Sequence, residues 1–217
     1  MANGEGFIAE LTAFQTERLL PIVRAGQGSL ETPTSGDLTK LLQVALTNEL
    51  NVTDLARAWM DTIAERDVKA AFAKQAEDER GHAKLISDRL ALLGIELPSA
   101  EALKPHPLFD YLRTLSGTVE RVAAALFTLE AMAYEVNAQF ITLCDRHGDV
   151  QTSRIYREYI QPDENMHQQM GRRLLVEHAQ GAEQATAFAV VGKVLEIAAS
   201  ARGKAAQKMG TACLPGC

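Results

Sequence analysis

Two five-residue stretches, Asp78-Glu79-Arg80-Gly81-His82 and Asp163-Glu164-Asn165-Met166-His167, decide the fold of this 217-residue chain. In each, a His follows the Glu by three residues, so on an α-helix both side chains lie on one face and can reach a common point. A further glutamate precedes each stretch: Glu49 lies 30 residues before the first Glu, and Glu130 lies 34 residues before the second. The chain therefore repeats one pattern, a Glu helix followed by an Asp-Glu-x-x-His helix.

The faces that carry these polar residues are otherwise apolar. Around Glu79, for example, the same stripe holds Phe72, Ile86 and Leu90. Burying an ionised carboxylate without a partner costs on the order of several kcal/mol of folding free energy. Two divalent cations would balance four such charges, and an oxygen-rich ligand set with two imidazoles suits iron or manganese better than structural zinc. The sequence therefore predicts a dinuclear metal site with these ligands: Glu49, Glu79, His82, Glu130, Glu164 and His167.

Apolar periodicity predicts helices along most of the chain, and no stretch has the alternation typical of a strand. The expected helices cover residues 6–20, where Pro21 interrupts, and then 37–64, 67–93, 118–146, 150–178 and 183–208. Asp67 is expected as an N-cap, Gly94 as the end of the third helix, and Gly26–Gly36 as a loop. We therefore expect an all-α protein with three parts: an N-terminal helix and loop packed on the bundle (1–36), the bundle itself with a fifth helix (37–209), and a flexible tail (210–217).

The connection between the second and third bundle helices has to run the length of the bundle if those helices are parallel. Residues 94–107 contain Pro98, Pro105 and Pro107, so they are not expected to be helical. Fully extended, they span about 48 Å, less than the roughly 54 Å needed if a straight helix began at Leu108. A break near Ser116-Gly117 is therefore predicted.

Composition excludes several classes of protein. Hydrophobic residues make up 47% and charged residues 23%, as in an ordinary globular domain, and the net charge of −6 provides no basic surplus for binding nucleic acid. Apolar runs such as Val122–Phe127 are too short to cross a membrane, and the first residues lack the pattern of a secretory signal. Three scattered cysteines fit a reducing compartment, so a cytoplasmic protein is expected.

The six predicted ligands resemble those of the ferritin-like di-iron carboxylate proteins, a four-helix bundle family with two Glu and two Glu-x-x-His helices. The resemblance covers about residues 37 to 178 and implies a long crossover between the second and third helices of the bundle, 67–93 and 118–146. It implies two iron ions, or manganese, bridged by Glu79 and Glu164, with Glu49 and Glu130 as terminal ligands. It also implies that Asp78 and Asp163 hydrogen-bond the ligand histidines and hold their tautomers; their alternative role is as solvated acids.

Three features depart from the family pattern. Pro162 lies two residues before Glu164, where its missing N–H favours a kink or a π-bulge. Ala133 and Tyr134 stand where rubrerythrins carry an additional carboxylate, and the chain has no Cys-x-x-Cys pair for a rubredoxin iron. Tyr134 is a candidate redox relay one turn after Glu130, or else a packing residue.

The expected function is an oxidoreductase that activates O₂ or peroxide, most simply an oxidase or oxygenase acting on a small organic substrate with electrons from an unidentified donor. The alternatives are a ferroxidase, iron-handling or peroxide-scavenging protein, and a helical module whose buried acids are only structural. A homodimer is possible, with no membrane or nucleic-acid partner. Cys213 and Cys217 allow a local disulfide or a metal site, but a disordered tail is preferred. Alanines on the stripes would leave room for a substrate or allow close helix packing: Ala45, Ala76, Ala123 and Ala133.

Overall fold

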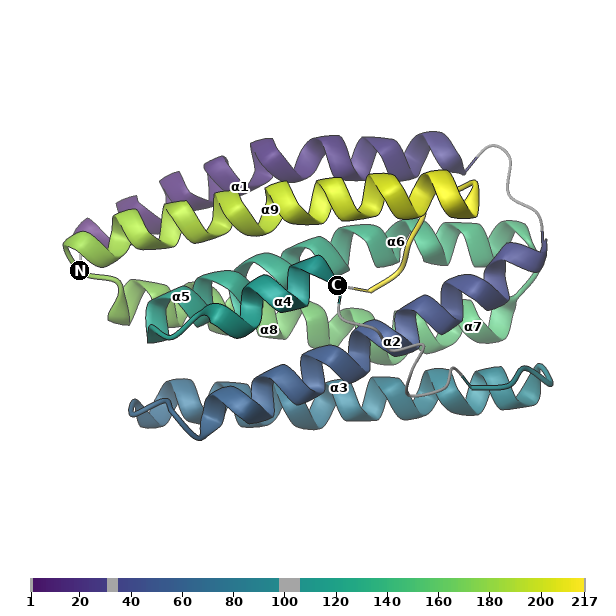
Figure 1. Cartoon of the computed structure of the whole chain (residues 1–217), viewed down its shortest axis with the longest axis horizontal. Helices are drawn as coiled ribbons and strands as arrows, with labels where there is room; N and C mark the ends of the chain where they lie inside the picture. Colours follow the sequence, from purple (N-terminus) through teal and green to yellow (C-terminus); the bar gives the residue numbers. More distant parts are fainter. Residues whose placement is uncertain (1, 31–34, 98–105, 217) are drawn as a thin grey trace.

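The computed structural model describes residues 2–30, 35–97 and 106–216, and every regular element in these ranges is a helix (Figure 1). The α-helices are α1 (Ala2–Ser29), α2 (Ser35–Met60), α3 (Arg66–Leu92), α4 (Pro107–Thr114), α5 (Thr118–Val122), α6 (Glu130–Arg146), α7 (Val150–Ile155), α8 (Gln161–His178) and α9 (Ala182–Met209). Two π-helical segments, η1 (Ala123–Leu129) and η2 (Tyr156–Ile160), join α5 to α6 and α7 to α8. The all-α prediction is confirmed.

The helices form three layers (Figure 1). The α2–α3 hairpin forms one side, the hairpin of α5-η1-α6 with α7-η2-α8 lies in the middle, and α1 pairs with α9 on the other side. Edge-on ring contacts hold α1 to α9, with the Phe14 and Phe188 centroids 5.2 Å apart. The middle hairpin is consequently covered on both faces, and every residue of η1 is buried.

Most predicted helix boundaries lie within a few residues of those in the structure. The first bundle helix, α2, ends at Met60 rather than at residue 64. Glu65, not Asp67, precedes α3, and its side chain makes no capping hydrogen bond. Gly94 has φ +70° and follows α3 as expected, because this conformation strains other residues.

The predicted break at Ser116-Gly117 is confirmed. The backbone is extended at Leu115 and Gly117, between α4 and α5, and the Glu120 carboxylate accepts a 2.7 Å hydrogen bond from the Gly117 N–H. Part of the predicted crossover, residues 98–105, lies outside the described residues.

The N-terminal helix is longer than predicted. Pro21 was expected to interrupt it, but α1 continues through Pro21 to Ser29 and includes the start of the expected loop. Proline removes one backbone hydrogen bond from a helix interior. Leu19 and Ile22, on either side of Pro21, are each only 7% exposed, so burial against the core offsets that loss.

The expectation of a flexible C-terminal tail is wrong. Residues 211–216, here called the C-terminal strap, pack inside the molecule, with Cys213 fully buried and Leu214 3% exposed. The Ala212 N–H donates to Ser29 Oγ at 2.8 Å, and Asn48 Nδ2 donates to the Pro215 carbonyl at 3.3 Å. Cys213 is a free thiol, and Cys217 lies outside the described residues.

The segment η1 places Glu130 in the core through a widened turn. The Glu130 N–H donates to the Ala125 carbonyl, five residues earlier, and Thr128 Oγ1 donates to the Ala123 carbonyl at 2.6 Å. From α1, Gln15 Nε2 donates to the Phe127 carbonyl at 2.7 Å. Both side chains thus add hydrogen bonds to backbone carbonyls of η1.

The segment η2 confirms the prediction made from Pro162. The Gln161 N–H donates to the Tyr156 carbonyl, again five residues earlier, immediately before the proline. The missing N–H of Pro162 would otherwise face a carbonyl on the preceding regular turn. Widening this turn accommodates the proline while the helix continues to Glu164.

Helix α9 is long and apolar enough, by length and composition alone, to cross a membrane. The most apolar 18-residue window is 33% buried, and one such helix is weak evidence for a span, because core helices pass the same test. The expectation from the length of uninterrupted apolar runs did not identify α9. The absence of a membrane partner therefore stays a prediction.

Candidate metal centre

The structure brings all six predicted ligands together in the core, on α2, α3, α6 and α8. Their ligand atoms form two groups, and within each group the atoms lie within 4.8 Å of one another. One group contains Glu49, Glu79 and His82, and the other contains Glu79, Glu130, Glu164 and His167. Each of the six side chains is at most 3% exposed. Glu79 belongs to both groups, which is the geometry expected of a bridging carboxylate.

The two histidines present the same nitrogen to the acids. His82 Nδ1 lies 3.3 Å from Glu79 Oε2 and 3.4 Å from Glu49 Oε2. His167 Nδ1 lies 3.5 Å from Glu79 Oε1 and 3.5 Å from Glu130 Oε2. One imidazole therefore lies at each carboxylate oxygen of Glu79.

The predicted aspartates hold the other nitrogen of each ring, and they do so across the two hairpins. Asp78 Oδ2 from α3 lies 2.9 Å from His167 Nε2 on α8. Asp163 Oδ2 from α8 lies 3.2 Å from His82 Nε2 on α3. A carboxylate at Nε2 keeps the proton there and leaves the Nδ1 lone pair free for a cation.

Two amide side chains, which the sequence did not identify as part of the site, hold individual carboxylate oxygens. Gln75 Nε2 donates to Glu130 Oε1, and Asn137 Nδ2 donates to Glu164 Oε1 at 3.4 Å. Gln75 lies four residues before Glu79, and Asn137 lies seven residues after Glu130. Both are buried polar residues on the ligand-bearing stripes, and that spacing was the available signal.

Burial and neighbouring charges shift the pKa values of the clustered acids and of His167. Burial raises the pKa of Glu49 and of Glu164 well above the usual range, and the charges on Glu79 and Glu130 respectively add to this. Burial opposes ionisation of Glu79 too, but polar contacts with Glu49 and both histidines hold its pKa well below the usual range. Burial would lower the pKa of His167, yet the charge on Glu130 and the hydrogen bond with Asp78 raise it to about 12.

The unpaired atoms in the core fit metal ions. Among the described residues, four buried ligand atoms have no hydrogen-bond partner: Glu79 Oε1, Glu130 Oε2, Glu164 Oε2 and His167 Nδ1. Buried polar atoms without a partner are rare in folded proteins and cost about 1 to 3 kcal/mol each. All four atoms belong to residues of one group, so a cation bound there would satisfy them together.

Tyr134 on α6, the candidate relay or packing residue, is 39% exposed. Its role as a relay stays a prediction. The tyrosine near the acids is Tyr156 on η2, which is fully buried. Burial and the charges of Glu49, Cys144 and Glu164 raise the pKa of Tyr156 well above its usual range. Its hydroxyl has no hydrogen-bond partner among the described residues.

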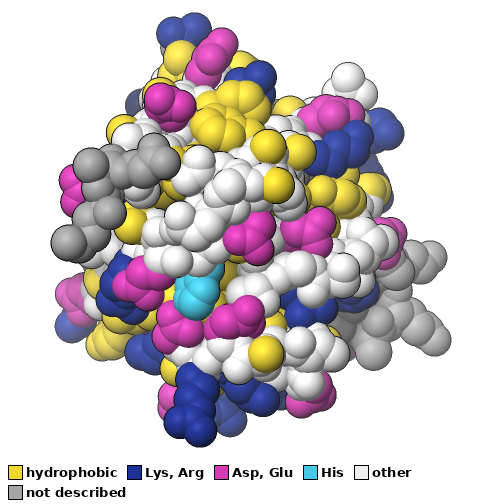
Figure 2. All heavy atoms as spheres, turned by 90° about the vertical axis from the view of Figure 1, so that its left-hand side faces the viewer, with side chains coloured by type: hydrophobic (Ala, Val, Ile, Leu, Met, Phe, Trp, Pro, Cys, Tyr) yellow, Lys and Arg dark blue, Asp and Glu magenta, His cyan; other side chains and the backbone are white. Residues whose placement is uncertain are grey.

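An exposed group at one end of the bundle contrasts with this centre. Figure 2 shows a histidine side chain surrounded by acidic side chains on the face at that end. Asp67, Glu177 and His178 can bring ligand atoms within 4.8 Å of one another there, and His178 Nε2 lies 2.7 Å from Asp67 Oδ2. These side chains are solvated and satisfied by one another, so the group is an ordinary surface ion pair with an acidic neighbour.

Comparison with known proteins agrees with this geometry. The profile of the family described as ferritin-like domain matches residues 39–179. The chain belongs to the ferritin-like family. Comparisons with curated proteins and with solved structures give no match. The ferritin-like match begins at α2 and ends just after α8, so it contains all six clustered ligands and excludes α1 and α9.

Proposed function

We propose that this ferritin-like chain is a di-iron oxidoreductase, with manganese as the alternative metal, and that it uses O₂ or peroxide to oxidise a small organic substrate. Two bound iron ions would supply the electrons and the open coordination positions for reducing O₂ or peroxide. Glu49 and Glu130 would serve as terminal ligands, and Glu79 and Glu164 as bridging ligands. His82 would bind one ion and His167 the other.

One observation carries the proposal: each histidine is held by an aspartate of the opposite hairpin. The pairs Asp78–His167 and Asp163–His82 hold both imidazoles with Nδ1 toward the acids. A core that only needed neutral packing would not require oriented imidazoles beside four carboxylates, whose burial is costly. The arrangement is therefore suited to binding two cations.

A cavity lined in part by two of the ligand-bearing helices, α2 and α6, favours an enzyme over iron storage. It has a volume of about 670 Å³, within the range of small-molecule sites. Among its lining residues are Asn48, directly before Glu49 on α2, and Met132, two residues after Glu130 on α6. An organic substrate bound there would lie next to the helices that carry the ligands.

Stepwise addition of Fe(II) to the metal-free protein, with O₂ present, tests the function. We expect binding and oxidation to saturate at about two irons per chain, as two ions balance four carboxylates. Continued oxidation of many irons per chain would contradict the proposal and support storage. Retention of less than about 0.2 iron or manganese per chain would support a purely structural cluster.

Glu79→Ala is the sharpest variant for this test, because Glu79 is shared by both groups. It should abolish stoichiometric binding of the second ion. Glu77→Ala is the matched control, since Glu77 is exposed on the same helix two residues earlier. Equal metal content in the two variants would place the ions elsewhere.

A further inference from the structure

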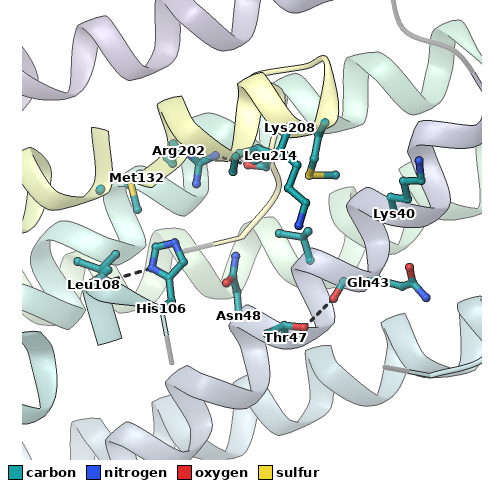
Figure 3. A pocket seen from close by; sticks show the side chains of 14 residues that line it. Lys40, Gln43, Thr47, Asn48, His106, Leu108, Met132, Arg202, Lys208 and Leu214 are labelled. Carbon is teal, nitrogen blue, oxygen red and sulfur yellow. Dashed lines mark hydrogen bonds between the residues drawn. The ribbon is translucent and has the colours of Figure 1, made fainter. Parts of the chain in front are cut away.

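The cavity of about 670 Å³ has walls from four parts of the chain. Figure 3 shows α2 on one side and α9 with the C-terminal strap on the other, with His106 and Met132 between them. Apolar lining is provided by Leu108, Met132 and Leu214, all buried. The inner part of the cavity thus suits an apolar chain.

The charged residues of the cavity are all basic. Lys40 from α2 and Lys208 from α9 lie on opposite walls, and Arg202 lies on α9 nearer the strap (Figure 3). None of the 14 described residues that line the cavity is acidic, although the whole chain has a net charge of −6. Two exposed lysines facing one opening in an acidic protein give it an electrostatic preference for anions.

Arg202 already has partners in the strap: its guanidinium donates to the carbonyls of Leu214 and Gly216. It therefore fixes the wall of the cavity, while Lys40 and Lys208 remain to bind a ligand. His106 completes this side. Burial and the charge of Arg202 lower the pKa of its imidazole, so it adds polarity without charge at neutral pH.

The strap connects the cavity to the candidate centre. Leu214 lines the cavity, and two residues later the Gly216 N–H donates to Asn137 Oδ1 at 2.8 Å. Asn137 in turn donates to Glu164 Oε1 at 3.4 Å. A molecule that presses on the strap would therefore act on a segment that holds a ligand carboxylate through one amide side chain.

We propose that this cavity binds a single-chain amphiphile with an anionic head group, with the head between Lys40 and Lys208 and the apolar chain against Met132 and Leu214. A carboxylate and a phosphate share the chemistry that two lysines recognise. The inference deepens the proposed function and rests on it, because this molecule would be its organic substrate. Binding is measured on metal-free protein, however, so a failure here is separate from a failure to bind iron.

Isothermal titration of the full metal-free chain with a set of ten-carbon probes tests the inference. We expect decanoate and decyl phosphate to bind about tenfold more tightly than decanol, because a hydrogen bond to a charged group is the stronger kind. Decyltrimethylammonium should not bind. Octanoate should bind about tenfold more weakly than decanoate, since each buried methylene contributes to affinity. The relative affinities of decanoate and decyl phosphate identify the preferred head group.

Exposed-residue variants locate the site without endangering the fold. The double variant Lys40→Gln/Lys208→Gln should lose about tenfold in decanoate affinity and none in decanol affinity. Lys204→Gln is the control. Lys204 is an exposed lysine of α9, the helix of Lys208, and does not line the cavity. Val44→Phe, which fills the cavity from α2, should weaken both probes.

Three results would overturn the inference: no binding of either anion, equal binding of decanol and decanoate, or unchanged decanoate affinity in the double lysine variant. If Val44→Phe folds poorly, the lysine variants decide alone. Saturation with two irons in a protein that binds no amphiphile would reject this inference and leave the proposed function standing.

Discussion

The two hairpins carry the same sequence pattern, but the helices that present it differ. In the α2–α3 hairpin, Glu49 and Glu79 lie within uninterrupted α-helices. In the second hairpin, a π-helical segment ends directly before Glu130, and another ends four residues before Glu164. An extra residue in a helical turn rotates every later side chain about the helix axis. A repeated motif therefore does not require a repeated backbone.

In the second hairpin, contacts from α1 and from the hairpin's own helix α8 support the segment η1. Gln15 from α1 binds the Phe127 carbonyl, and Gly171 of α8 lies against the backbone of η1. A Cβ on Gly171 would lie 2.6 Å from the Leu126 carbonyl carbon. These contacts, and not an intrinsic preference of the segment, hold the wider turn in place.

Gly171→Ala in the second hairpin should have the largest effect on stability. The added Cβ has only backbone to displace, so we expect a loss of about 3 kcal/mol in the free energy of unfolding. Gly81→Ala is the counterpart in the first hairpin, since its Cβ would meet nothing within 4 Å. That variant should be stabilised by up to about 1 kcal/mol, because alanine is the better helix former. Urea unfolding measures both, and equal effects would show that η1 is not braced by α8.

Replacing Asp78 or Asp163 should have the next largest effect, on metal affinity. Asp78→Asn and Asp163→Asn keep the shape of each side chain but remove the charge that orients a histidine. Each should weaken metal binding by about 10- to 100-fold. The Asp78 variant should lose more metal affinity than the Asp163 variant, because the Asp78 side chain is 10% exposed and that of Asp163 is 34% exposed.

Competition with a chelator of known affinity would measure the metal affinities of the aspartate variants. Asp88→Asn, an exposed position on α3, is the control and should leave the metal affinity unchanged. If the Asp163 variant instead lost more affinity than the Asp78 variant, our ranking by exposure would be wrong.

Gln15→Met tests the contact from α1 at a smaller scale. The Phe127 carbonyl would lose its 2.7 Å hydrogen bond while the methionine filled similar space. A loss of about 1 kcal/mol in unfolding free energy is expected. Circular dichroism during chemical denaturation provides the measurement, with Gln207→Met on α9 as an exposed control. An unchanged stability would mean that η1 does not depend on α1.

Tyr156→Phe should have the smallest effect. The hydroxyl has no partner among the described residues, whereas the ring packs edge-on against Phe140 with centroids 5.0 Å apart. Removing an unsatisfied buried hydroxyl should leave the free energy of unfolding within about 0.5 kcal/mol of the parent, or raise it. A larger loss would reveal a hydrogen bond to a buried water molecule.

The sequence was sufficient for the fold class and the clustering of the six predicted ligands. Spacing along single helices determines which side chains share a face, and the cost of burying acids explains why they meet. The π-helix at Pro162 was also predictable, because a missing N–H is a local property. The segment at η1 was not: Gln15 and Gly171, which stabilise it, are distant in sequence.

The error about the C-terminal tail has a physical cause. Residues 211–216 contain Pro and Gly, which favour a loose tail, yet distant partners such as Asn48 and Ser29 bind their backbone. Tyr134 and Tyr156 look equally eligible in sequence, but only the packed structure distinguishes an exposed ring from a buried one. Local preference fails wherever tertiary contacts decide.

The strap also bears on the order of folding. It meets Ser29 across 183 residues and Asn48 across 167 residues of chain, among the longest separations in the fold. Closing such loops is entropically costly until the helices between them have assembled. The strap should dock late, onto a bundle already formed. The cavity wall that Leu214 provides would then be among the last parts of the molecule to appear.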